Sequence, residues 1–203
     1  MSRLALIMAL SGAFAAAAAL SQAPAPGASS PLLSVRPEPA RDPWWQRSTL
    51  TPRSTVVRGI PIKRFEPAWC AADAFTRELF GEELLGAAGG RPLDGLAFTL
   101  DAPFDGSGKL QTAFVGAYQR CDGERGLFIA ITDPLPQRQG ERSRMRFMVE
   151  VPDPGTAFAG LSLEPDGSLA VWWCGGCNNG HRIAYSRETR GFFVAGPATR
   201  TDQ

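Results

Sequence analysis

The chain has 203 residues, with 21 Lys and Arg, 20 Asp and Glu and a single His, so its formal net charge is only +1. Nucleic-acid binding depends on clustered basic residues that release counterions. Here the arginines are scattered and the only lysines are Lys63 and Lys109, so this composition does not indicate a nucleic-acid partner.

Residues 1–21 are typical of a secretory signal peptide. Arg3 precedes an uncharged run from Leu4 to Leu20, and Ala19 and Ser21 stand at the minus-three and minus-one positions of a cut before Gln22. The run is short for a membrane span of about 20 residues, so cleavage is favoured over an uncleaved anchor. Cleavage removes Arg3 and leaves 20 basic against 20 acidic residues. A periplasmic or secreted protein with no membrane span after cleavage is therefore expected.

Residues 22–45 form a Pro- and Ala-rich tract that predicts a disordered linker. Residues 46–203 are then expected to be a single globular domain. Trp44 and Trp45 at the border either dock on that domain or present an exposed aromatic pair to a ligand. The segment 54–67 contains two prolines and predicts an edge strand or an extended arm.

From Pro67 the pattern predicts the one helix of the mature chain, which ends at Gly86 or Gly89. Its apolar side is expected to be core, because a helix that covers a sheet needs such a stripe. The residues expected there are Trp69, Ala71, Ala72, Phe75, Leu79 and Phe80.

The residues after Arg91 alternate as strands. The pattern predicts Leu96, Phe98 and Leu100 on one strand face, and Arg146 and Glu150 opposite the apolar face of strand 145–151. Turn residues predict hairpins between 109–119 and 126–133, around Pro165, Asp166 and Gly167, and between the last two strands. The fold class expected is therefore α+β, with one N-terminal helix packed on a curved antiparallel sheet of about seven or eight strands. A small β-barrel or sandwich with a helical lid is the alternative.

The stretch Trp173-Cys174-Gly175-Gly176-Cys177 resembles the thioredoxin active-site motif over these five residues. In that family the first thiol lies at a helix N-terminus, which stabilises its thiolate. Here a turn and an alternating strand follow, so a thiol-disulfide oxidoreductase using Cys174 and Cys177 is only an alternative. The same two cysteines with His181 could supply three metal ligands, one short of a closed zinc site. We therefore expect no metal and no cofactor.

A disulfide is the third interpretation of this stretch. If Gly175 and Gly176 form a tight turn, the Cα atoms of Cys174 and Cys177 lie about 4.5 to 5.5 Å apart, within disulfide range. Elimination then pairs Cys70 with Cys121, which would join the predicted helix to the sheet. The crossed pairings stay open, and so does a bend at Asn178–Gly180 instead.

These features predict an exported, non-catalytic binding or interaction module of the cell envelope for an unknown protein, glycan or small molecule. The binding residues expected are Trp172, Trp173, Tyr185 and His181. Two enzymes are the alternatives to this binding module: the thiol-disulfide oxidoreductase described above and a carboxylate-based hydrolase. Its acids would come from Asp101, Asp105, Glu150, Asp153, Glu164 and Asp166.

Overall fold

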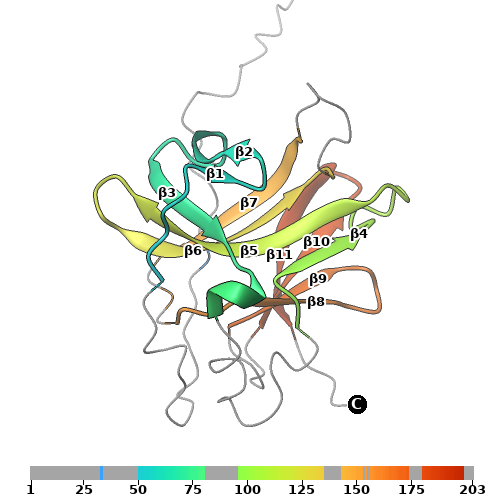
Figure 1. Ribbon diagram of the computed structural model, residues 1–203. Helices are drawn as coiled ribbons and strands as arrows, with labels where there is room; N and C mark the ends of the chain where they lie inside the picture. Colours follow the sequence, from blue (N-terminus) through green and yellow to red (C-terminus); the bar gives the residue numbers. More distant parts are fainter. Residues whose placement is uncertain are drawn as a thin grey trace, which may run out of the picture.

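The computed structural model describes residues 33, 50–80, 96–134, 143–152, 154, 156–173 and 180–198 (Figure 1). Within these residues the chain forms three antiparallel sheets, of five, four and two strands. Only 6% is helical, and none of the described helices reaches seven residues. None of them is long and apolar enough to cross a membrane.

The five-stranded sheet, called the main sheet below, has the order β3-β5-β6-β7. Two strands share one edge of β5: β4 pairs with residues 111–114 and β3 pairs with residues 116–120. Because β6 pairs along the whole other edge, β5 is the centre of this sheet. The strands are β3 (Trp69–Ala74), β4 (Thr99–Ala102), β5 (Gln111–Arg120), β6 (Arg125–Thr132) and β7 (Met145–Pro152).

The four-stranded sheet, called the second sheet, has the order β11-β10-β9-β8. The sequence predicted all three hairpins correctly: β5–β6, β8–β9 and β10–β11. Gly167 in the β8–β9 turn has φ +80°, a conformation that glycine adopts cheaply. The strands are β8 (Gly160–Leu163), β9 (Leu169–Trp172), β10 (Gly180–Ser186) and β11 (Gly191–Ala198).

The two sheets enclose one apolar core. Ile129 and Val149 of the main sheet and Val171 and Ile183 of the second sheet are buried members of it. An isolated bridge from Ala97 to Leu161 joins the sheets at one edge. At the other edge the rings of Phe147 on β7 and Phe192 on β11 lie 6.2 Å apart between centroids.

A second apolar cluster covers the outer face of the main sheet. Its cover is a short arm made of β1 (Val56–Val57), β2 (Ile60–Pro61) and a 3-10 turn, Ile62–Arg64. Phe65 at the end of this arm contacts the rings of Trp69, Phe114 and Phe128. The expected extended arm at residues 54–67 is therefore a cover, and β5 and β6 are buried on both faces.

The predicted helix from Pro67 to Gly86 or Gly89, and with it the α+β class, is wrong. Residues 69–74 are strand β3, and only residues 77–80 of the described part of this region are helical. The pairing register shifts between Trp69 and Ala71, so Cys70 is the extra residue of a β-bulge. The bulge buries Trp69 and Ala72 on the same face, and this spacing of three residues imitates a helical stripe.

The alternative, a barrel or sandwich with a helical lid, is wrong about the lid. Two sheets do face each other, but the outer face of the main sheet is covered by the β1–β2 arm rather than by a helix. Residues 81–95, which would complete the predicted helix, lie outside the described residues.

Leu33 is described within the predicted linker 22–45. Its side chain is buried, and its backbone N–H donates to the carbonyl oxygen of Glu150 on β7 at 2.8 Å. The chain thus touches the edge of the main sheet at this residue. Trp44 and Trp45 lie outside the described residues.

Candidate functional site

Cys174 and Cys177 lie outside the described residues, so their roles as a disulfide, a dithiol or metal ligands stay predictions. Of the suggested metal ligands only His181 is described. Among the described residues no group of three His, Cys, Asp or Glu side chains could hold a metal ion.

Trp172 and Trp173, expected at an aromatic rim, are both buried in the core. Trp172 pairs with Gly160 on one side and Gly180 on the other, and its indole occupies the space above Gly180: a Cβ added there would lie 2.7 Å from the ring. Its Nε1 donates to Ser162 Oγ at 2.8 Å. The rim interpretation is therefore corrected for both indoles, because both are buried members of the core cluster that the two sheets share.

His181 is half-buried on β10 and contacts Trp173. The indole Nε1 of Trp173 donates to Nδ1 of His181 at 3.0 Å, and the rings meet edge-on. An Nδ1 atom that accepts a hydrogen bond carries no proton, so the imidazole is neutral with its proton on Nε2. Burial lowers the pKa of His181, which also favours the neutral form.

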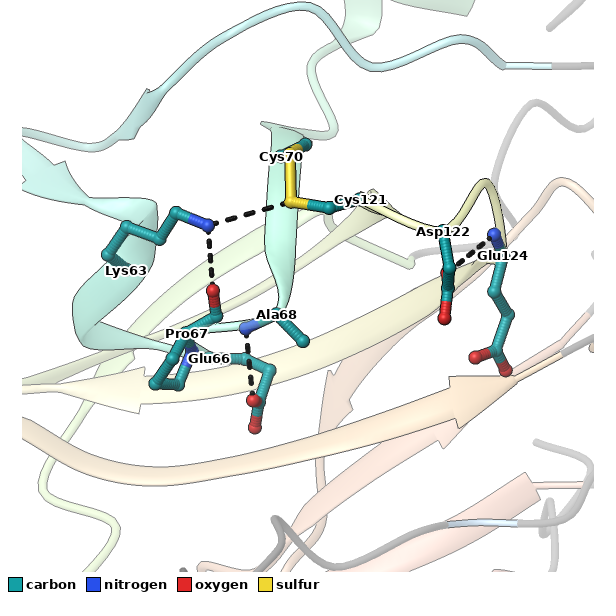
Figure 2. Close-up of a disulfide and its surroundings, with 8 residues drawn as sticks. All are labelled: Lys63, Glu66, Pro67, Ala68, Cys70, Cys121, Asp122 and Glu124. Atoms are coloured by element: carbon teal, nitrogen blue, oxygen red, sulfur yellow. Dashed lines mark hydrogen bonds between the residues drawn. A yellow bond between two sulfur atoms is a disulfide. The ribbon is translucent and has the colours of Figure 1, made fainter.

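Cys70 and Cys121 form a disulfide, with their Cα atoms 4.9 Å apart (Figure 2). This pair was predicted by elimination from the sequence, after Cys174 had been paired with Cys177. The bond joins strand β3 to the turn after β5, however, and not a helix to the sheet. Both residues are exposed.

The acids considered for a hydrolase are engaged separately. Asp101 accepts from Thr112 Oγ1 at 2.6 Å, and Asp166 accepts from both N and Oγ of Ser168. Glu164 accepts from Ser162 at 3.3 Å. Each of these contacts stabilises a strand end or a turn. Asp153 lies outside the described residues.

Glu150 is fully buried, contrary to the half-buried strand that its alternation predicted. Its carboxylate accepts hydrogen bonds from the Arg120 guanidinium and from the Trp69 indole. Tyr118 stacks on Trp69 with centroids 4.9 Å apart, and its hydroxyl has no hydrogen-bond partner among the described residues. Burial and then the Glu150 charge raise the pKa of Tyr118 well above its ordinary value. This network adjoins the apolar cluster under the β1–β2 arm and has the character of a structural ion pair.

Three partly buried aromatic rings gather where β7 meets β11, and we call them the aromatic edge: Phe147, Tyr185 and Phe192. Tyr185 and Phe192 are direct cross-strand partners with ring centroids 5.1 Å apart, and Phe147 approaches Phe192 from the main sheet. Tyr185 was predicted as a binding residue. The structure adds the two phenylalanines beside it.

A polar group flanks the aromatic edge. Arg146, next to Phe147, is the bulged residue of β7. Its guanidinium lies 3.4 Å from Asp105 and 3.8 Å from Asp133. The β4–β5 turn at Gly106 lies close to the side chain of Arg187. Arg187 follows Tyr185 by two residues, so this turn and its neighbour Asp105 lie near the aromatic edge.

The ionised state of Asp105 is favoured. Burial acts to raise its pKa, but hydrogen bonds from Ser107 and Gln111, together with the Arg146 charge, lower the pKa below its ordinary value. The polar group therefore keeps a fixed negative charge beside the Arg146 cation at neutral pH.

Sequence reasoning missed Phe147, Phe192, Arg146 and Asp133 as a group. Phe147 was assigned to a core face and Arg146 to the solvent face, which is correct for each residue alone. Their gathering depends on β7 lying beside β11, a contact between strands that are far apart in the sequence, at Met145–Pro152 and Gly191–Ala198.

Comparison of this chain with protein-family models, curated proteins and solved structures found no match.

Proposed function

We propose that the protein is an exported, non-catalytic binding module of the cell envelope that recognises a glycan through its aromatic edge. The observation that carries this proposal is the contact of Phe147, Tyr185 and Phe192, three partly exposed rings contributed by two different sheets. Rigid aromatic side chains with few rotatable bonds contribute large contact areas at low entropic cost, so they are common anchors of binding sites.

The neighbouring polar group supports a ligand rich in hydroxyl groups. The Arg146 nitrogens lie 3.4 and 3.8 Å from Asp105 and Asp133, longer than the roughly 2.7–2.9 Å of a tight charge-assisted hydrogen bond. These groups therefore keep hydrogen-bonding capacity. A sugar ring offers an apolar C–H face for the aromatics and hydroxyls for the polar group.

Two features support export. Residues 1–21 have the layout of a signal peptide. The Cys70–Cys121 disulfide is compatible with the oxidising compartments in which such bonds persist.

Titration with a panel of soluble oligosaccharides, followed by amide chemical shifts, tests the proposal. Shifts are expected to concentrate at Tyr185, Phe192 and Phe147. Replacing an anchoring aromatic typically costs about 2 kcal/mol or more, so Tyr185→Ala is expected to weaken binding by about 30-fold or more.

Phe193→Ala is the matched control. Phe193 is 45% exposed and pairs with Ala184, so it lies on the opposite face of β11 from Phe192. Its removal is expected to leave affinity within about twofold. Shifts that concentrate elsewhere, or equal effects of both variants, contradict the site; binding of peptides but not sugars contradicts the ligand class.

A further inference from the structure

The Cys70–Cys121 disulfide lies at the surface, at an irregular point of the main sheet. Cys70 is the bulged residue of β3, so the ladder assigns it no partner opposite on β5. Cys121 begins the turn after β5, and its N–H donates to Ala68 at 2.9 Å. Both residues are exposed, so a thiolate from solution can approach the bond without the core opening.

One of the two sulfurs has a cation beside it. Lys63 Nζ lies 3.7 Å from Sγ of Cys121 (Figure 2). The same ammonium donates to the carbonyl oxygen of Pro67 at 2.7 Å, which holds it in place. A cation at this distance stabilises a thiolate on Cys121 and makes that sulfur the better leaving group in an exchange reaction.

Two carboxylates around the bond accept hydrogen bonds from backbone groups, and a third is paired with an arginine. Asp122 accepts from the N–H of Glu124 at 3.1 Å, and Glu66 accepts from the N–H of Ala68 at 3.2 Å. In Figure 2 Asp122 and Glu124 lie on the far side of Cys121 from Lys63. Glu124 also lies 3.5 Å from the guanidinium of Arg120. Lys63 is therefore the charge in direct contact with the sulfur.

We propose that this disulfide is a site of directed thiol–disulfide exchange with an external thiol. The incoming thiolate attacks Sγ of Cys70 and forms a mixed disulfide there. The bond between the two cysteines breaks, and its electron pair leaves on Cys121 as a thiolate next to Lys63. A second thiol of a dithiol partner then attacks the mixed disulfide, releasing Cys70 as a thiol and the partner as its own disulfide.

Incubation of the folded protein with reduced glutathione, followed by alkylation, tests the direction of attack. Trypsin separates the two sites: Cys70 lies in the peptide 65–77 and Cys121 in the peptide 121–125, both distinct from the peptide that carries Cys174 and Cys177. Mass spectrometry is expected to find glutathione mainly on Cys70 and the alkyl group mainly on Cys121.

Variants at Lys63 test the role of the cation. Lys63→Gln is expected to slow the first exchange about two- to threefold and to divide the glutathione more evenly between the two cysteines. Lys63→Arg is expected to keep both rate and direction. Arg64→Gln, which removes a positive charge one residue away, is expected to change neither.

Glutathione mainly on Cys121, an unchanged product ratio in Lys63→Gln, or exchange only after denaturant is added each overturn the proposal. Exchange only after denaturation would mean that the disulfide has a structural role alone. These outcomes are independent of the proposed glycan site, because binding at Tyr185 is measured on the oxidised protein.

Discussion

His181 links the protonation of one side chain to the packing of the core. Its Nδ1 accepts from the buried indole of Trp173, and burial lowers its pKa. The unfolded state, in which the histidine has its ordinary pKa near 6.5, therefore binds more protons than the folded state as the pH falls. The contribution of His181 to stability is complete above about pH 6.5 and is lost as the pH drops below it.

We expect the free energy of unfolding, measured by urea denaturation, to fall between pH 7 and pH 5. His181→Asn is the informative variant, because its amide oxygen can accept from Trp173 and does not titrate. This variant is expected to reduce the pH slope. An identical slope in the variant would assign the pH dependence to other groups.

At the scale of single residues, the sequence predicted the cysteines better than the tryptophans. Cys70 and Cys121 could be paired by elimination, because only four cysteines are present. The burial of both Trp172 and Trp173 could not be foreseen, because a strand pattern does not tell whether its second face is covered. Gly180, which pairs with Trp172, is the residue that makes room for its ring.

The strands of the main sheet are tied together by the buried pair of Glu150 on β7 and Arg120 on β5. Glu150→Leu leaves the Arg120 guanidinium and the Trp69 indole without this acceptor, and breaking a buried pair in this way costs about 3–5 kcal/mol. Adding Arg120→Met removes the charge that Glu150 no longer balances and that Glu124 pairs with only at 3.5 Å. The double variant is therefore expected to be only about 1–3 kcal/mol less stable than the wild type, the cost of one orphaned indole donor.

Chemical denaturation of the two variants and the wild type measures these differences. A double variant as unstable as Glu150→Leu alone would show that Arg120 is solvated well enough to need no acid partner. If the double variant regains stability as expected, apolar packing can replace the Glu150–Arg120 ion pair.

At the scale of elements, the strands with clear alternation were predicted, including β7 with its bulge at Arg146, whereas β3 with its bulge at Cys70 was not. The strand around Phe147 and the three hairpins follow from period-two patterns and turn residues. The bulge at Cys70 breaks that period, so the burial of Trp69 and Ala72 imitated a helix. A single inserted residue thus accounts for the wrong secondary structure of this segment.

The molecule as a whole depends on its N-terminal arm, because that arm buries the outer face of β5 and β6. The ring of Phe65, at the end of the arm, packs against the rings of Trp69, Phe114 and Phe128. Phe65→Ala is expected to cost about 3–5 kcal/mol, the usual range for a buried phenylalanine. Val56→Ala in the same arm, at a side chain that is 46% exposed, is expected to change stability by less than about 1 kcal/mol.

Thermal or urea unfolding of the two variants tests this difference. A small loss for Phe65→Ala would mean that the arm adheres weakly and that the two-sheet core carries the stability alone.

At the scale of the whole molecule, the sequence predicted an antiparallel meander in one curved sheet, with a barrel or sandwich as the alternative, whereas the described strands form three sheets. Local hairpins can be inferred from turns, whereas the bridge from Ala97 to Leu161 and the contact of Phe147 with Phe192 join distant segments. The aromatic edge depends on the second of these contacts. Its location was therefore beyond reach from residue patterns alone.

The separation of 51 positions between Cys70 and Cys121 also imposes an order in time. A chain made at about 5–20 residues per second exposes Cys70 for roughly 3–10 s before its partner exists. During that interval β3 has no β5 to pair with, and Cys70 is a lone thiol. When Cys121 emerges, Cys174 and Cys177 have still to be made, so the chain order favours the pairing of Cys70 with Cys121 if the cysteines are oxidised in the order in which they emerge.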